Sequence, residues 1–250
     1  MEDGPALFIF AHQDDEFVYL CMLRNMAKSG REVHVLWITD GARFVPAEVR
    51  KAESTAVMRM VGVGEDSLSF WPYPDGASIG FAKEIVERLT ETMEDIRPSQ
   101  VYTDGFEGGH PDHDMAHFAA VTAARRLDPS IPVFEAPLYN RHGRRRWRFS
   151  QFIPAETETL YVPVPRDGII MKLRALLRYK SQFWIAVLPM LLFTNKRETM
   201  SHGEPYRRVP AWNYRQPPHE GKLIYEGLFF RRILGIRFSD FREAVSRVGS

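Results

Sequence analysis

Cysteine is almost absent from this sequence, since Cys21 is the only one in 250 residues. A single thiol cannot form a disulfide within the chain, which excludes the disulfide-stapled secreted folds. Residues 1–5 also lack the basic and apolar segments of a secretory signal peptide. We therefore expect a protein of the reducing cytoplasm.

Long hydrophobic runs are missing as well. The longest lies at residues 183–193, has eleven residues and contains Pro189, so it is too short to cross a bilayer as a helix. We expect this segment to belong to the core. A lid over a substrate site and a docking surface for a lipid-linked sugar are the alternatives.

Neither sign of charge is in clear excess, because the chain has 33 Lys and Arg residues and 32 Asp and Glu residues, which gives a formal net charge of +1. This balance gives no reason to expect nucleic acid or an acidic membrane surface as the main partner. Apolar content is ample, with 44% hydrophobic and 12% aromatic residues. We expect one domain over residues 1–250, with a core at 1–140 and a specificity portion at 141–250. Whether copies of the chain associate is left open.

Apolar runs alternate with helical patterns along the first 140 residues. The pattern predicts strands at 6–11, 33–39, 68–73, 100–103 and 133–138, and helices at 16–29, 47–61, 81–96 and 113–127. Near-continuous apolar strands that alternate with helices are typical of a mostly parallel sheet covered on both faces. The predicted fold class is α/β, a Rossmann-like doubly wound sheet with a loop-rich C-terminal extension.

Two clusters of polar residues follow strands of this predicted sheet. The sequence AHQDDE at residues 11–16 comes directly after the first strand, and HPDH at 110–113 follows the fourth. In a doubly wound sheet of order 3-2-1-4-5 these two strands are neighbours, and the loops that leave their carboxyl ends open a crevice. We therefore expect His12, Asp15 and His113 to converge there.

The two clusters together favour a metal site. Imidazole and carboxylate suit zinc, and a catalytic zinc site typically has three protein ligands and an open fourth position. Charge buried at this density is costly unless a metal or a reaction uses it. Each cluster alone has a simpler interpretation, because acidic residues are typical of helix N-termini and a histidine-rich loop needs no function.

The paired motifs AHQDDE and HPDH resemble the signature of the LmbE/PIG-L family, metal-dependent hydrolases that remove acetyl groups from N-acetylglucosamine-type sugars. Three more segments are similar in the same order: Thr39-Asp40-Gly41, Arg50-x-x-Glu53, and the stretch from Lys172 to Ser181-Gln182. The resemblance covers roughly residues 6–183. Gln13 stands where proline is commonest in the family, which bears on loop rigidity more than on metal binding.

The resemblance implies a role for each motif residue. The ligands of one Zn²⁺, or of another divalent metal, would be His12, Asp15 and His113. Asp14 would be the general base that takes a proton from the attacking water. His110 would stabilise the oxyanion, and Asp112 would orient a histidine or contact the substrate. The implied substrate is an N-acetylated amino sugar, either free or linked to a phosphate, nucleotide or lipid.

Three further residues near the motifs have two interpretations each. Arg50 faces the sugar, as the resemblance implies, or it is a surface residue paired with Glu53 on the same helix. Glu16 is a site residue or an acid in the first turn of the following helix. His117 lies one helical turn after His113, and we expect it to pack rather than to reach the site.

The C-terminal portion offers fewer signals. Residues 141–148 contain five arginines, among them Arg144 and Arg145, which would clamp a phosphate on the substrate or form a solvated surface. Residues 202–208 and 217–221 predict ordered loops, and residues 223–233 predict a final strand. The aromatic residues expected to anchor a small core, rather than stack on a sugar, are Trp212, Tyr214 and Tyr225.

Two other functions fit parts of the pattern. His12-x-Asp14 with His113 also matches the two-histidine, one-carboxylate triad of non-haem iron oxygenases, although those ligands usually sit on an all-β barrel. A non-catalytic sugar-binding protein on the same fold is the second alternative. The complete ligand set and the presence of Asp14 disfavour it.

Overall fold

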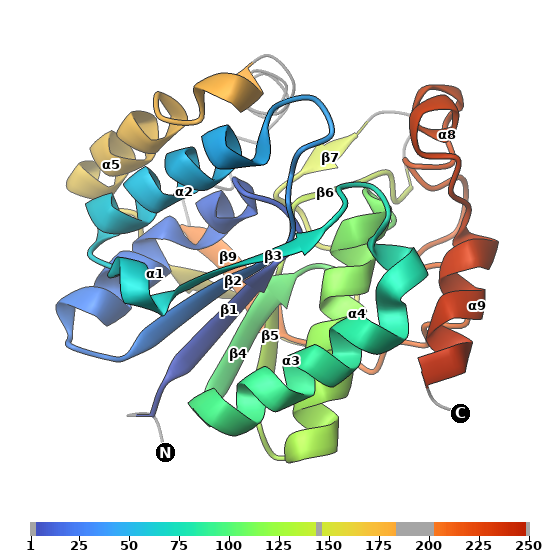
Figure 1. Ribbon diagram of the computed structural model, residues 1–250, viewed down its shortest axis with the longest axis horizontal. Coiled ribbons are helices and arrows are strands. Elements are labelled where there is room, and N and C mark those ends of the chain that lie inside the picture. Colours follow the sequence, from blue (N-terminus) through green and yellow to red (C-terminus); the bar gives the residue numbers. More distant parts are fainter. Residues whose placement is uncertain (1–3, 144–146, 184–202, 249–250) are drawn as a thin grey trace.

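A mixed β-sheet forms the centre of the molecule in this computed structural model, which describes residues 4–143, 147–183 and 203–248 (Figure 1). In this part of the chain the main sheet has seven strands in the order β3-β2-β1-β4-β5-β9-β8. They are β1 (Ala6–Phe10), β2 (Val33–Thr39), β3 (Leu68–Tyr73), β4 (Gln100–Asp104), β5 (Val133–Ala136), β8 (Leu160–Val162) and β9 (Glu204–Arg208). The first five are parallel, and β9 and β8 add an antiparallel edge.

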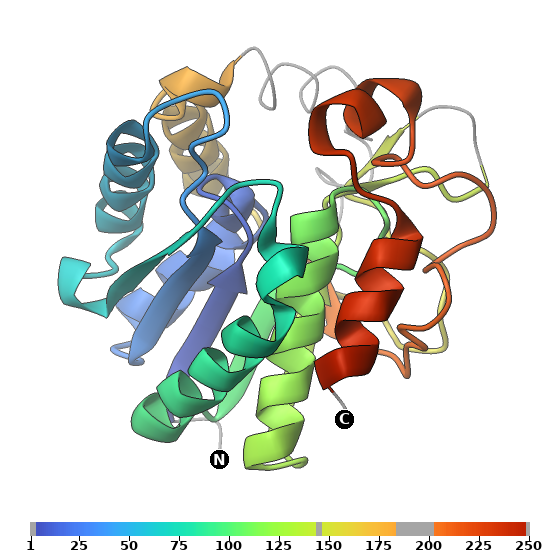
Figure 2. The same ribbon diagram turned by 45° about the vertical axis from the view of Figure 1, so that its right-hand side comes forward.

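Helices cover both faces of the sheet, which confirms the predicted α/β class. One face carries α1 (Leu20–Lys28), α2 (Ala47–Val61) and α5 (Arg166–Leu176). The other, turned forward in Figure 2, carries α3 (Ala82–Ile96), α4 (Pro111–Leu127) and α9 (Phe238–Val248). The shorter elements are the 3-10 helices η1 (Asp15–Tyr19), η2 (Glu65–Ser67), η3 (Ser78–Phe81) and η4 (Lys180–Gln182), the helix α8 (Leu228–Leu234), and the small hairpin β6 (Tyr139–Asn140) and β7 (Arg148–Phe149).

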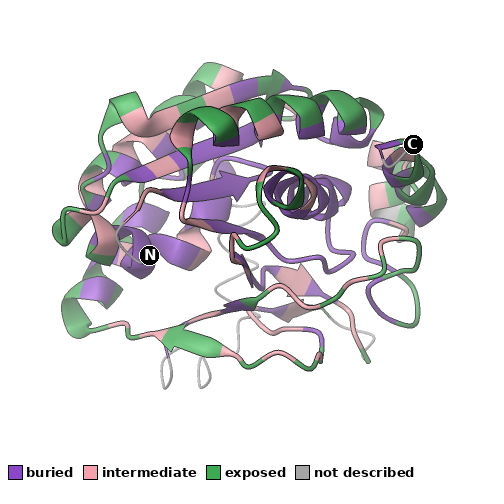
Figure 3. Cartoon of the chain, turned by 90° about the horizontal axis from the view of Figure 1, so that it is seen from below, coloured by how far each residue is buried: buried purple, intermediate pink, exposed green. Residues whose placement is uncertain are grey.

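The layers explain why the strands read as apolar runs and the helices as apolar stripes in the sequence. Every side chain of β1 is fully buried, because the strand is flanked by β2 and β4 and covered by helices on both faces. Figure 3 shows such buried strands between helices whose outer faces are exposed. On α3 the buried residues recur at helical spacing, as Ile85, Val86, Leu89 and Met93, so only one stripe faces the sheet.

Two predictions for the C-terminal portion are wrong. Residues 204–208, expected as a loop, form β9, which pairs antiparallel with β5. Their strand character is hidden in the sequence because Pro205 and two arginines interrupt the apolar pattern, and Arg207 is buried by an ion pair with Glu135. Residues 228–234, expected within a strand at 223–233, form α8. The apolar positions 230, 233 and 234 have helical rather than alternating spacing.

The sheet order brings the two motif loops together, as predicted from topology. Strands β1 and β4 are hydrogen-bonded neighbours, with Ile9 opposite Thr103, so both loops leave the same edge of the sheet. The Ala11 backbone N–H donates to the Asp104 carboxylate at 2.8 Å and ties the two strand ends directly.

None of the helices in the described residues has both the length and the apolar character that a bilayer span requires.

Candidate metal centre

Three side chains from the two motif loops converge at the carboxyl ends of β1 and β4. His12 and Asp15 come from the loop after β1 and the start of η1, and His113 lies in the first turn of α4. His12 Nδ1 is 3.2 Å from His113 Nε2 and 3.4 Å from Asp15 Oδ2. Asp15 Oδ1 is 3.2 Å from His113 Nε2. The structure therefore brings together the three residues predicted as ligands.

The spacing of these donor atoms fits a tetrahedral metal ion. Ligand atoms about 2.1 Å from a tetrahedral zinc lie about 3.4 Å from one another. The three separations are 3.2, 3.2 and 3.4 Å, the two that involve Asp15 end on different oxygens of its carboxylate, and all three side chains are buried. Two imidazole nitrogens that face each other with their lone pairs repel unless a proton or a cation lies between them. The donor set thus suits zinc or a similar divalent ion.

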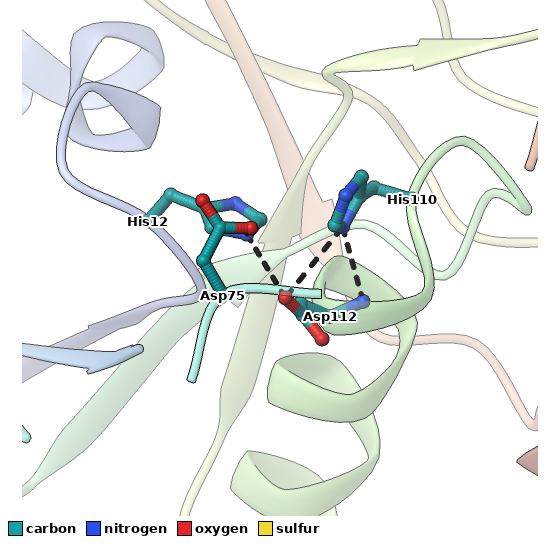
Figure 4. Close-up of side chains that lie close together, drawn as sticks. All are labelled: His12, Asp75, His110 and Asp112. Carbon is teal, nitrogen blue, oxygen red and sulfur yellow. Dashed lines mark hydrogen bonds and ion pairs between the residues drawn. The ribbon is translucent and has the colours of Figure 1, made fainter. Parts of the chain in front are cut away.

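The second ring nitrogen of His12 faces a different pair of carboxylates (Figure 4). His12 Nε2 is 3.1 Å from Asp112 Oδ2 and 3.3 Å from Asp75 Oδ1. Asp112 also accepts hydrogen bonds from the Gly76 N–H and from both the N–H and the hydroxyl of Ser78. Burial opposes its ionisation, but these donors and His12 hold the pKa of Asp112 well below its usual value.

An ionised Asp112 fixes the orientation of His12. When the neutral His12 ring donates from Nε2–H to Asp112, its Nδ1 lone pair faces His113 and Asp15. His12, Asp75, His110 and Asp112 also form a group of possible metal ligands. The Asp112 oxygens in that group already carry four hydrogen-bond contacts, so the set of His12, Asp15 and His113 is the better ion site. Asp112 thus contacts a histidine of the site, as the predicted orienting role requires.

Asp14, next to Asp15 in the sequence, has a left-handed backbone conformation. Its φ of 116° places it in the left-handed region, a rare position for a residue other than glycine. Arg50 donates to Asp14 Oδ1 at 3.1 Å. Burial raises the pKa of Asp14 to about 6. The positive charge of Arg50 opposes this shift, and the negative charges of Asp15 and Glu16 add to it. A carboxyl group with this pKa takes up a proton readily near neutral pH.

Glu16 holds the unusual conformation of Asp14 in place. It lies in the first turn of η1, as one interpretation of the sequence expected, yet it is fully buried. Its carboxylate accepts hydrogen bonds from the Asp14 N–H at 2.8 Å, from Trp37 Nε1 at 2.9 Å and from the Tyr179 hydroxyl at 2.8 Å. Glu16 is therefore a support for the site rather than a solvated helix cap.

Arg50 is not a surface residue paired with Glu53, so that interpretation is wrong. Its side chain is buried, and Glu53 instead accepts hydrogen bonds from the Ser181 N–H and hydroxyl. Arg50 Nε and Nη1 are buried and have no hydrogen-bond partner among the described residues. Arg50 is therefore a buried cation that pairs with Asp14 through Nη2.

His110 is held as a neutral imidazole with a defined proton position. It is the N-cap of α4, and its Nδ1 accepts a hydrogen bond from the Asp112 N–H at 3.2 Å. Burial, with the neighbouring His12, lowers the pKa of His110 to about 3. A neutral ring that accepts at Nδ1 carries its proton at Nε2. That nitrogen is therefore a hydrogen-bond donor.

The core residues predicted around the site are confirmed as core. His117 is fully buried, its Nδ1 lies 2.9 Å from the Asp104 backbone oxygen, and it does not reach the three candidate ligands. Trp212 and Tyr214 pack against Phe106 in the same cluster that contains the fully buried Tyr225.

Sequence reasoning missed two residues of the site. Asp75 follows β3 at the same edge of the sheet, and its place directly after a strand was the available signal. Tyr139 packs edge-on against the His113 ring at 5.3 Å, and no sequence pattern marks it. Arg144 and Arg145 lie outside the described residues, as do residues 184–193 of the apolar segment.

The loop before His110 allows a stability prediction. A Cβ atom on Gly109 would lie 2.3 Å from the Tyr139 backbone oxygen, which cannot move aside cheaply. We expect Gly109→Ala to lower the free energy of unfolding by about 2 kcal/mol or more, because overpacking against backbone forces a local shift. Denaturant unfolding measures it. Gly80→Ala is the control, with no atom within 4 Å of its added Cβ. Equal stabilities of the two variants would contradict this packing.

Comparison with protein families supports the resemblance seen in the motifs. Residues 7–124 match the family model PIG-L, described as GlcNAc-PI de-N-acetylase, and this span contains both motif loops. A 1D-myo-inositol 2-acetamido-2-deoxy-alpha-D-glucopyranoside deacetylase of Saccharopolyspora erythraea is 34% identical over 52% of this chain and 56% of its own length. An enzyme of the same name from Kineococcus radiotolerans is 28% identical over 47% of this chain and 44% of its own length. The chain thus spans about half the length of these curated relatives.

Solved structures share the fold over most of the chain. A deacetylase of teicoplanin biosynthesis, in complex with teicoplanin, has a TM-score of 0.64 at 15% identity and covers 84% of this chain and 100% of that one. The N,N'-diacetylchitobiose deacetylase of Pyrococcus horikoshii has a TM-score of 0.60 at 20% identity, with 83% and 84% covered. A 4-carboxy-2-hydroxymuconate hydratase of Pseudomonas putida has a TM-score of 0.55 at 16% identity, with 84% and 97% covered. Because a hydratase shares the fold, the reaction has to be argued from the site.

Proposed function

We propose, from the match of residues 7–124 to the PIG-L family model, that this chain is a metal-dependent hydrolase that removes the acetyl group from an N-acetylglucosamine-type sugar. One observation carries the proposal. The facing ring nitrogens of His12 and His113 lie 3.2 Å apart, each lies 3.2 to 3.4 Å from one oxygen of the Asp15 carboxylate, and Asp14 is close enough for the Asp15 charge to raise its pKa. Such a site combines a place for a divalent cation with a general base.

Zinc is the metal that this donor set suits best, with His12, Asp15 and His113 as its ligands. When bound, such an ion lowers the pKa of a coordinated water to roughly 7 and polarises a carbonyl oxygen. The oxygenase alternative used Asp14 as its carboxylate ligand. Asp15 is the carboxylate that lies with both histidines, and Asp14 is held by Arg50 instead. That leaves Asp14 free for proton transfer.

Asp14 would carry the proton through the reaction. It accepts a proton from water as the water oxygen attacks the carbonyl carbon of the acetamide. It then delivers this proton to the sugar nitrogen as the carbon–nitrogen bond breaks, so acetate and a free amine leave. A pKa raised to about 6 suits both steps, because the group is ionised at neutral pH and is still basic enough to be protonated.

His110 would stabilise the negative charge that develops on the carbonyl oxygen. Its Nε2 carries the proton, because Nδ1 accepts from the Asp112 N–H. Asp112 therefore has two positioning roles, one toward His12 through its carboxylate and one toward His110 through its backbone. Donors fixed before the reaction give the largest stabilisation of a developing oxyanion.

The substrate class rests on the relatives and on Arg50. Both curated relatives are named for a 2-acetamido-2-deoxy-glucopyranoside, and the family description names GlcNAc-PI. Arg50, which pairs with Asp14, would lie next to the reacting acetamide and contribute positive charge there. Arg144 and Arg145 as a phosphate clamp, and residues 141–250 as the specificity portion of a single domain, remain predictions.

A screen of N-acetylglucosamine conjugates for acetate release tests the proposal. We expect at least one conjugate with a free, phosphate-linked or lipid-linked anomeric position to yield acetate and a free amine in equal amounts. Metal-loaded protein that releases acetate from none of them would contradict the proposed function.

A further inference from the structure

The outer face of α5 carries a stripe of large aliphatic side chains that nothing in the described structure covers. Ile169, Ile170, Leu173 and Leu177 are 38%, 51%, 53% and 69% exposed. At about 100° per residue these positions lie within one arc of about 100° on the helix surface. Met171, Ala175 and Leu176 of the same helix pack into the core. The helix therefore has a buried apolar side and an exposed apolar side.

Basic residues flank this apolar stripe. Arg166, Arg174, Arg178 and Lys180 are all exposed. Asp167 is the only acid between residues 166 and 183, and it is paired with Arg24. The stripe and these four cations are called the α5 face below. Its local charge is strongly positive, although the positive and negative charges of the whole chain nearly cancel.

We propose that the α5 face docks on the surface of an anionic lipid bilayer. A helix with aliphatic residues on one arc and arginines beside it is the arrangement that lies in a membrane interface, where the apolar side chains insert and the cations meet lipid phosphates. A symmetric contact with a second copy of the chain would instead bring the Arg174 and Arg178 of both copies together, which like charges disfavour.

The α5 face is linked to the catalytic motif by short hydrogen-bonded contacts. Just after the helix, the Tyr179 hydroxyl donates to Glu16 at 2.8 Å, and Glu16 accepts from the Asp14 N–H. Ser181 then donates to Glu53 of α2, the helix that carries Arg50. Figure 1 shows α5 in the outer layer beside α2. Docking would therefore place the bilayer on the layer of the molecule that supports Asp14 and Arg50.

Vesicle sedimentation of the full chain tests the docking without any assumption about catalysis. We expect binding to vesicles of phosphatidylcholine with phosphatidylglycerol, and weaker binding to phosphatidylcholine alone. Leu173→Ser with Leu177→Ser should lower the partition coefficient about tenfold or more, because two partly inserting side chains are lost. Arg174→Gln with Arg178→Gln should lower it by a similar factor, on anionic vesicles only.

Leu228→Ser is the matched control, because Leu228 of α8 is 76% exposed and α8 lies on the opposite side of the molecule (Figure 1). Its partition coefficient should equal that of the wild type. The proposal is wrong if the wild type ignores anionic vesicles, or if the α5 and α8 variants lose binding equally. It is also wrong if light scattering shows a dimer that Leu173→Ser with Leu177→Ser dissociates, since the α5 face would then be an interface between copies.

A second readout separates this proposal from the proposed function. Acetate release from a water-soluble N-acetylglucosamine conjugate should be the same in the wild type and in Leu173→Ser with Leu177→Ser, because neither residue touches the metal centre. If the wild type releases no acetate but binds anionic vesicles, the proposed function fails and the docking surface stands. If acetate is released and no vesicle binds, the docking surface fails alone.

Discussion

Replacing Asp14 by asparagine should leave the metal content unchanged and lower turnover by about a hundredfold or more. The amide has the same size and tolerates the left-handed backbone, with φ of 116°, that this position requires. It cannot accept a proton, so both proton transfers assigned to Asp14 are lost. Steady-state acetate release and elemental analysis of the same preparation measure the two effects.

Asp40→Asn is the matched control for this variant. Asp40 follows β2 at the same edge of the sheet, and its Oδ1 only accepts hydrogen bonds from the Ala42 and Asp75 N–H groups. An amide oxygen can take over that role, so turnover should stay within a few-fold of the wild type. Near-wild-type turnover in Asp14→Asn would instead mean that Asp14 is a structural residue of the loop.

Replacing His113 by alanine should remove most of the bound metal. The rate of acetate release should fall with it, by about a thousandfold or more. The wild type should hold about one divalent ion per chain. His113 supplies one of only three donors, and its Nε2 lies 3.2 Å from both other ligand side chains. Metal content per folded chain, measured after gel filtration, checks the effect.

His117→Ala controls for the loss of a buried histidine from the same helix. His117 lies one turn further along α4, contacts Asp104 and Glu135, and does not face the three candidate ligands. This variant should be less stable than the wild type but should keep its metal. Equal metal content in His113→Ala and the wild type would overturn the ligand assignment.

The sheet and its main site were predictable because both follow from local patterns and one topological rule. The apolar strands and helical stripes fix five parallel strands, and right-handed crossovers then place β1 beside β4. That rule alone brings His12 and Asp15 to His113. The predicted helix at 47–61 and the strands at 33–39 and 68–73 agree with α2, β2 and β3 to the residue.

The remaining features depend on tertiary contacts that leave no pattern in the sequence. Arg50 is buried because Asp14 lies within hydrogen-bond distance, and no spacing along α2 reveals this. Strand β9 contains Arg207, whose charge is compensated by Glu135 from a strand about seventy residues away. Asp75 reaches His12 only because β3 and β1 end at the same edge of the sheet.

The most direct test of the central claim is acetate release from a soluble N-acetylglucosamine conjugate before and after removal of the metal. Metal-loaded wild-type protein should release acetate and free amine in equal amounts. Stripping with a chelator should abolish this activity, and one equivalent of a divalent ion such as Zn²⁺ should restore it in the wild type but not in Asp14→Asn. Acetate release that continues unchanged in the stripped protein would contradict the account.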